Sequence, residues 1–282
     1  MLRLAISVSL LLAGGCERNG VLLWRAQSRG ATIYLLGTVA TREGEPARFD
    51  PRIEAAFRAS DELVLESRVD PGASIEFQDR VLKVVHFPSG DTLHAHISPE
   101  LEQKLAKVAE RAGGSIDGLQ PYRPWFIAIV IGNEEKKRLG YPISRPIDRH
   151  FADAAAMPVS YLLSPEDVVP MLTGLSEEAN ADCLAETLEA TSGYDSDLSD
   201  AYRAWRRGDE RAFVEAKRKQ MAKHPRCARE LREARVPILT RKLLHLFEEP
   251  KITFAVVNAM TLVEDDGILA TLRGHGIAIE KL

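Results

Sequence analysis

A glutamate at the end of an apolar run is the first residue in this sequence whose position suggests chemistry. Glu66 follows the run 63–65, which is typical of a short buried strand, so its carboxylate would project from a strand end. Carboxylates placed in such clefts often carry function. The alternative is a structural role, in which Glu66 pairs with a cation. The candidate partners are Arg25, Arg42 and Arg68.

A second charged group stands at the expected start of a helix. Arg145, Asp148 and Arg149 follow one another closely there. The amino end of a helix favours negative charge, so these residues could hold an anionic ligand. The alternative is an ordinary solvated helix end. The sequence has no Gly-x-Ser-x-Gly elbow, so it lacks the usual signature of a serine α/β-hydrolase. It also has no phosphate-binding loop and no dinucleotide-binding glycine motif.

The first cysteine stands in a targeting sequence. Residues 1–15 contain one arginine, an apolar run of ten residues and then small residues, a pattern typical of a secretory signal peptide. The run is too short to span a bilayer. Cys16 follows directly and is the expected lipidation site of a bacterial lipoprotein. The alternatives are plain secretion and a buried apolar segment. We expect a protein of the bacterial cell envelope that faces the periplasm, anchored by lipid or secreted.

The two other cysteines are Cys183 and Cys227, and both fall in helical patterns. An oxidising compartment favours a bond between such a pair. We therefore predict a disulfide, with two buried free thiols as the alternative.

Composition narrows the class of protein. The 282 residues are 45% hydrophobic and 28% charged, as in ordinary globular proteins, and the formal net charge is −4. That charge provides no basic excess to collect phosphates, so we expect no nucleic-acid partner.

The order of the elements predicts an α/β (α+β) fold. Short strand patterns at 32–36 and 63–65 precede a long helical region, and 252–257 and 277–279 follow it. A further strand pattern at 158–162 interrupts the helical part. We predict one domain at 16–282, in which 16–71 and 251–282 build a mixed sheet and 72–250 forms a mostly helical insert. Pro237 should kink or break the last helix of that insert.

Two stretches of the sequence resemble the TraB/GumN family, which includes the Tiki-type metalloproteases. They are 21–66, with Gly37-Thr38-Val39-Ala40 inside it, and 254–273, with Asn258-Ala259-Met260-Thr261 inside it. The resemblance implies a mixed α/β fold in which two strands end in Gly-x-x-His. It also implies that both histidines and the glutamate matching Glu66 build a divalent-metal hydrolytic site.

The sequence departs from the family pattern at most positions of that site. The two histidines are replaced by Ala40 and Thr261, and the second glycine is replaced by Asn258. A family glutamate matches Leu163. An arginine–asparagine pair matches Arg235-Val236. Imidazole and carboxylate are the groups that suit a transition metal, so these replacements predict a degenerate site.

Two functions follow as expectations. The first is a pseudoenzyme that uses no cofactor and binds an envelope protein or peptide in the vestigial crevice. The second is a hydrolase with an altered active site, whose cofactor would be a divalent metal such as Mn, Co or Zn. The vestigial site candidates are Gly37, Ala40, Glu66, Asn258 and Thr261.

Overall fold

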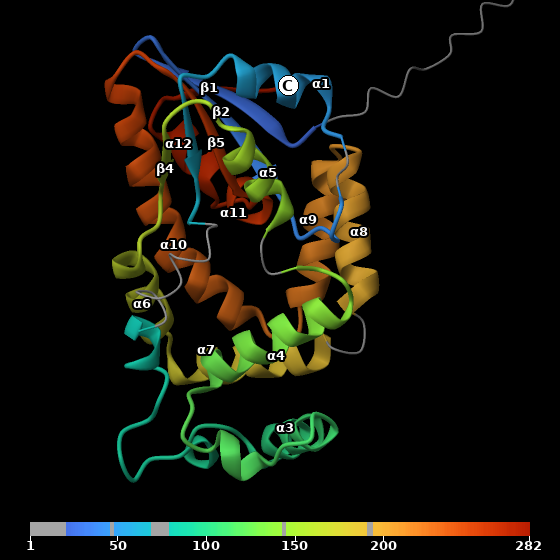
Figure 1. The fold of residues 1–282 in the computed structure, drawn as a ribbon. Coiled ribbons are helices and arrows are strands. Elements are labelled where there is room, and N and C mark those ends of the chain that lie inside the picture. Colours follow the sequence, from blue (N-terminus) through green and yellow to red (C-terminus); the bar gives the residue numbers. More distant parts are fainter. Residues whose placement is uncertain (1–20, 46–47, 69–78, 143–144, 191–193) are drawn as a thin grey trace, which may run out of the picture.

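The apolar runs of the two terminal regions assemble into one sheet (Figure 1). The computed structural model describes residues 21–45, 48–68, 79–142, 145–190 and 194–282. The strands are β1 (Leu23–Ser28), β2 (Ala31–Thr38), β3 (Glu62–Leu65), β4 (Val159–Tyr161), β5 (Ile252–Asn258) and β6 (Ala278–Lys281). Their order is β4-β3-β5-β2-β1-β6. The mixed sheet predicted from both ends of the chain is confirmed, and the strand predicted at 158–162 joins it as β4.

The strand directions decide where functional side chains meet. The four strands β4, β3, β5 and β2 are parallel, whereas β1 is antiparallel to both of its neighbours, β2 and β6. The carboxyl ends of the parallel strands therefore lie at one edge of the sheet. Crevices outside such ends are the usual ligand sites of open α/β sheets.

The helices divide between the two faces of this sheet and a separate helical region. Those of the first half of the chain are α1 (Pro51–Arg58), α3 (Pro99–Arg111), α4 (Pro124–Arg138), α5 (Pro146–Ala154) and α6 (Pro165–Thr173). Those of the second half are α7 (Glu177–Ala190), α8 (Tyr194–Arg206), α9 (Glu210–Met221), α10 (Pro225–His245), α11 (Ala259–Val263) and α12 (Ile268–Gly274). Short 3₁₀ turns lie at Leu93–Ala95, Ile116–Leu119 and Leu246–Glu248.

The register assigns side chains to the two faces. Phe254 of β5 packs against Phe57 of α1 and Phe151 of α5, with ring centroids 5.4 and 5.0 Å apart. Leu63 pairs with Phe254 and so points to that face, while Val64 points to the opposite face, which α10 covers. By the same alternation Glu66 lies on the α10 side of its strand end.

A second apolar cluster fills the helical region. Its buried members come mainly from α3, α4 and α7, and they include Leu105, Trp125 and Leu184. Cys183 of α7 and Cys227 of α10 form a disulfide inside this cluster, which confirms the predicted pair. The more C-terminal residues of α10 pack in the sheet core instead, so this helix connects the two clusters.

Of the two outcomes predicted at Pro237, a kink or a break, the break was wrong and the kink stays a prediction. Helix α10 continues through this residue to His245. Proline removes one backbone donor and costs a helix interior about 3 kcal/mol. The neighbouring Val236, Leu239 and Leu243 are buried against the sheet core, and their burial outweighs that penalty.

Among the described residues, none of the helices is both long and apolar enough to cross a membrane. Residues 1–20, which hold the predicted signal peptide and Cys16, lie outside the described part of the chain.

Candidate functional site at the strand ends

Glu66 is buried and its two carboxylate oxygens are both engaged. Its relative exposure is 1%. Oε1 forms a close ion pair with the guanidinium of Arg235 on α10. Oε2 accepts a hydrogen bond from the backbone N–H of Asn258 at 2.7 Å. The carboxylate therefore ties the end of β3 to the end of β5 and to α10.

The partner expected for Glu66 was wrong. Arg25 pairs with Glu280 at 2.5 Å, while Arg42 and Arg68 lie over the rings of Tyr141 and Tyr161. The observed partner, Arg235, comes from a helix 169 positions later in the chain. Only the packing of α10 across the sheet brings it to Glu66.

Asn258, at the second glycine position of the family pattern, caps a helix. Its side-chain Oδ1 accepts hydrogen bonds from the backbone N–H groups of Met260 at 3.0 Å and Thr261 at 3.3 Å. Asparagine is among the best residues for this position because it satisfies the free donors of the first turn. The side chain of Asn258 is thus committed to the start of α11.

Gly37, the first glycine of the pattern, allows close packing. A Cβ atom at this position would lie 3.1 Å from both Cα and Cβ of Ala259 on α11. Its carbonyl oxygen accepts a hydrogen bond from Trp205 Nε1 at 2.6 Å, which holds α8 against the end of β2. The glycine is therefore needed where β2, α8 and α11 meet.

We predict that Gly37→Ala lowers the free energy of unfolding by about 1–3 kcal/mol, because the added methyl group overpacks a closed contact. The matched control is Gly132→Ala in α4, where a Cβ would meet only Thr187 Cγ2 at 3.7 Å. That change should leave stability unchanged or raise it by up to about 1 kcal/mol, because alanine is the better helix former. Urea denaturation of both variants measures the difference; equal midpoints would contradict the packing role of Gly37.

The remaining positions of the family pattern carry weak or no metal ligands. Ala40 is exposed beyond β2, and Thr261 is buried in the first turn of α11. Leu163 and Val236 are buried in the sheet core. Within the described part of the chain, no three His, Cys, Asp or Glu side chains are grouped so that they could hold a metal ion. The residues present at the strand ends do not fit the metal that the resemblance implies.

The charged residues at the start of α5 divide between the site and the surface. Asp148 is 3% exposed, and its pKa is raised mainly by this burial and also by the nearby charge of Glu66. Arg145 forms an ion pair with Asp148 at 3.4 Å and donates a hydrogen bond to the carbonyl of Ser67 at 2.7 Å. Arg149 instead pairs with Asp153 at 3.1 Å. The structure thus brings Arg145 and Asp148, but not Arg149, to the end of β3; the anion-binding role of the three stays a prediction.

Asp148 should make stability depend on pH. Burial raises its pKa to about 6 from an ordinary value of 3.8, and Arg145 opposes the change less strongly. As pH rises, the Asp148 carboxyl loses its proton at a lower pH in the unfolded chain than in the folded one. The contribution of the protonated carboxyl to the free energy of unfolding is therefore complete below pH 4 and is lost by pH 6.

We therefore expect Asp148→Asn to gain stability over the wild type as pH rises from 4 to 7, by up to about 3 kcal/mol. Chemical denaturation at several pH values measures this difference. Asp153→Asn, on the exposed side of the same helix, is the control and should leave the pH profile unchanged. Parallel profiles for the wild type and Asp148→Asn would refute the effect of burial.

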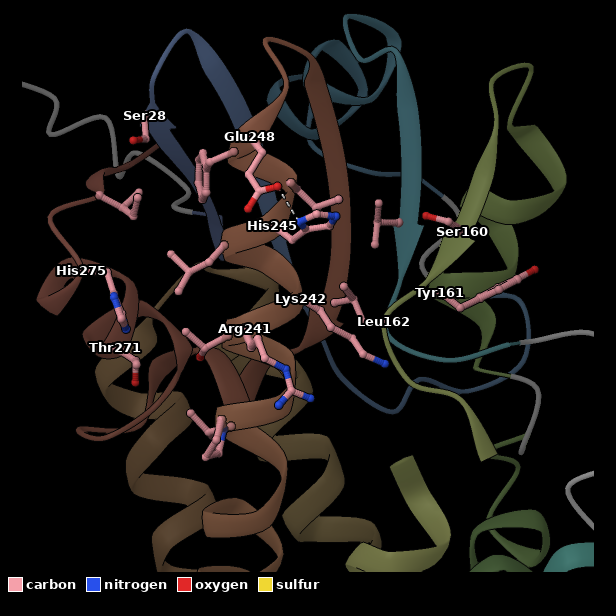
Figure 2. A pocket seen from close by; sticks show the side chains of 18 of the residues that line it. Ser28, Ser160, Tyr161, Leu162, Arg241, Lys242, His245, Glu248, Thr271 and His275 are labelled. Atoms are coloured by element: carbon pink, nitrogen blue, oxygen red, sulfur yellow. Dashed lines mark ion pairs between the residues drawn. The ribbon is translucent and has the colours of Figure 1, made fainter. Parts of the chain in front are cut away.

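A groove lies along α10, beside the strand-end cluster that Glu66, Arg235 and Asn258 form. It has a volume of about 1200 Å³ and reaches both sides of the helix (Figure 2). Val64 of β3 is part of its lining. On one side it meets β4, where Ser160, Tyr161 and, just after the strand, Leu162 line it. No pattern in the sequence pointed to this groove, because it depends on how α10 crosses the sheet.

The chain was compared with family models, curated proteins and solved structures. The model of the TraB/PrgY/gumN family matches residues 22–281. Neither the curated proteins nor the solved structures give a match. The matched range takes in both halves of the sheet and the helical region between them.

Proposed function

The chain belongs to the TraB/PrgY/gumN family, and from this premise we propose that it is a non-catalytic member that binds a peptide or protein partner. The observation that carries the proposal is the state of Glu66. This carboxylate is the only acidic residue retained at the matched positions, and both of its oxygens are occupied by Arg235 and by the backbone of Asn258. It serves as a structural link between strands.

The replaced positions support the same conclusion. A metal that activates water needs imidazole, carboxylate or similar ligands that leave one position open. Ala40 has no ligand atom, Thr261 offers a neutral hydroxyl, and the side chain of Leu163 is apolar. The architecture of the strand ends is kept by Gly37 and Asn258, whose roles in packing and capping do not require catalysis.

The expected location fits a binding protein of the cell envelope. Cleavage before Cys16 and acylation of its thiol would attach the chain to a membrane facing the periplasm, where its disulfide would be stable. Loss of acyl labelling in Cys16→Ser supports this anchor; labelling that persists in the variant refutes it.

A cleavage assay tests the absence of catalysis. The purified chain is incubated with a mixture of unstructured peptides and with Mn²⁺, Co²⁺ or Zn²⁺ in turn, and the products are read by mass spectrometry. We expect no cleavage above that of a Glu66→Gln variant. Metal-dependent cleavage that is lost in Glu66→Gln would show the alternative, a hydrolase with an altered site.

One observation favours that alternative. Asp148 has a raised pKa and lies close to Glu66, and two carboxyl groups with different proton affinities are a common feature of acid–base sites. If the cleavage assay is positive, Asp148→Asn should also lower the rate. If it is negative, the pair is structural.

A further inference from the structure

We infer that the outer edge of β4, together with the groove beside α10, binds an extended acidic peptide as an added strand. The inference rests on the proposed binding function and names the class of ligand. It places the ligand beside the strand-end cluster rather than within it.

The outer edge of β4 offers backbone groups for pairing. The carbonyl of Pro158 accepts from the N–H of Leu63, and the N–H of Leu162 donates to the carbonyl of Leu65. In a parallel ladder this alternation turns the N–H and C=O groups of Val159 and Tyr161 away from β3. Strand β4 ends the sheet, and within the described part of the chain no segment pairs with its outer side.

The side chains of β4 show the same alternation. Figure 2 shows Ser160 and Tyr161 pointing to opposite sides of the strand. Ser160 pairs with Val64 and shares its face, which is the face of α10. Every second side chain of a strand added beside β4 would therefore project toward the groove.

The lining of the groove favours negative charge on those side chains. Its acidic members already have partners: Glu233 faces Arg229, Asp266 faces Arg232, and Glu248 lies 2.8 Å from the ring of His245. Arg241 also lines the groove, and it has no hydrogen-bond or ion-pair partner among the described residues. A carboxylate on the ligand would supply one.

A buried hydroxyl in the groove lacks a partner as well. Thr240 lines the groove and is 3% exposed, yet its Oγ1 has no hydrogen bond among the described residues. Buried polar groups are nearly always paired in native proteins. A peptide side chain or backbone group that enters the groove can satisfy it.

The pattern of N-methylation on a probe peptide tests the strand pairing. The probe is a fluorescein-labelled nonapeptide of alternating valine and glutamate, measured by fluorescence anisotropy against the full chain. One analogue is N-methylated at every glutamate and the other at every valine. The charge of the groove should turn all glutamate side chains of the probe toward α10. The N–H groups of one residue type then point toward β4 and those of the other type point away. One analogue should therefore lose binding at least tenfold, and the other should bind nearly as the parent does. Equal binding of both analogues, or no binding of the parent, overturns the inference.

The charge requirement is tested on the protein. Arg241→Gln should weaken binding of the parent peptide about threefold to tenfold. The matched control is Arg273→Gln, an exposed arginine of α12 outside the groove and without a partner in the described part of the chain, which should leave affinity unchanged. Equal affinity of the two variants overturns the inference.

The same samples separate this inference from the proposed function. Mass spectrometry shows whether the probe stays intact. Cleavage of the probe would contradict the proposed non-catalytic function. A difference between the two N-methylated analogues would still support strand pairing. An intact probe with equal binding of the analogues removes only the pairing.

Discussion

Replacing Arg235 with methionine is expected to lower the free energy of unfolding by about 3–5 kcal/mol. The change leaves the carboxylate of Glu66 buried at the end of β3 without its guanidinium, while the Asn258 N–H remains its other partner. Breaking one member of a buried ion pair is strongly destabilising because the other charge stays desolvated. Chemical denaturation at neutral pH measures the loss.

Two controls separate the ion pair from a general effect on α10. Arg229→Met removes an exposed arginine whose partner, Glu233, lies 3.8 Å away, and it should change stability by less than about 1 kcal/mol. The double substitution Glu66→Met with Arg235→Met should be less destabilised than the sum of its single changes, because no buried charge is left alone. Additive losses would contradict the coupling between these two side chains.

Removing the disulfide is the second change with a large expected effect. Cys183 and Cys227 are 44 positions apart, and closing a loop of that length constrains the unfolded chain by about 4 kcal/mol in the entropy model. Cys183→Ala with Cys227→Ala should therefore be less stable than the oxidised wild type by about 2–4 kcal/mol, measured by thermal or urea denaturation.

A reductant provides the matching comparison. The wild type in dithiothreitol should lose stability and approach the double variant, whereas the double variant should not respond. If reduction left the wild-type midpoint unchanged, the bond would contribute nothing to the stability of the helical region.

Much of the fold could be predicted because its elements are local patterns. The buried strands 32–36, 63–65 and 252–257 are short apolar runs with β-branched residues, and all three are present. The start of α1 at Pro51 is also a local feature, because the side chain of the preceding Asp50 accepts a hydrogen bond from the N–H of Arg52. The break expected at Pro237 did not occur. The local penalty of a proline is visible in the sequence, whereas the burial that offsets it is not.

The site was less predictable because it depends on contacts between distant segments. The sequence identified Glu66 at a strand end, but its ion pair with Arg235 requires the packing of α10 on the sheet. Asp148 was a candidate, yet its burial beside Glu66 could not be read from a charged helix start. Gly37 and Asn258 were matched to a motif, while their packing and capping roles follow only from the position of α11.

A cobalt titration of the purified chain tests most directly whether the strand ends are unable to bind a divalent metal. Absorbance in the visible range and calorimetry follow binding by the wild type and by Ala40→His with Thr261→His, which restores the two imidazoles. We predict no saturable site in the wild type, and a gain of binding in the variant if the geometry of the crevice survives. Stoichiometric, tight cobalt binding by the wild type that is lost in Glu66→Gln would contradict the account.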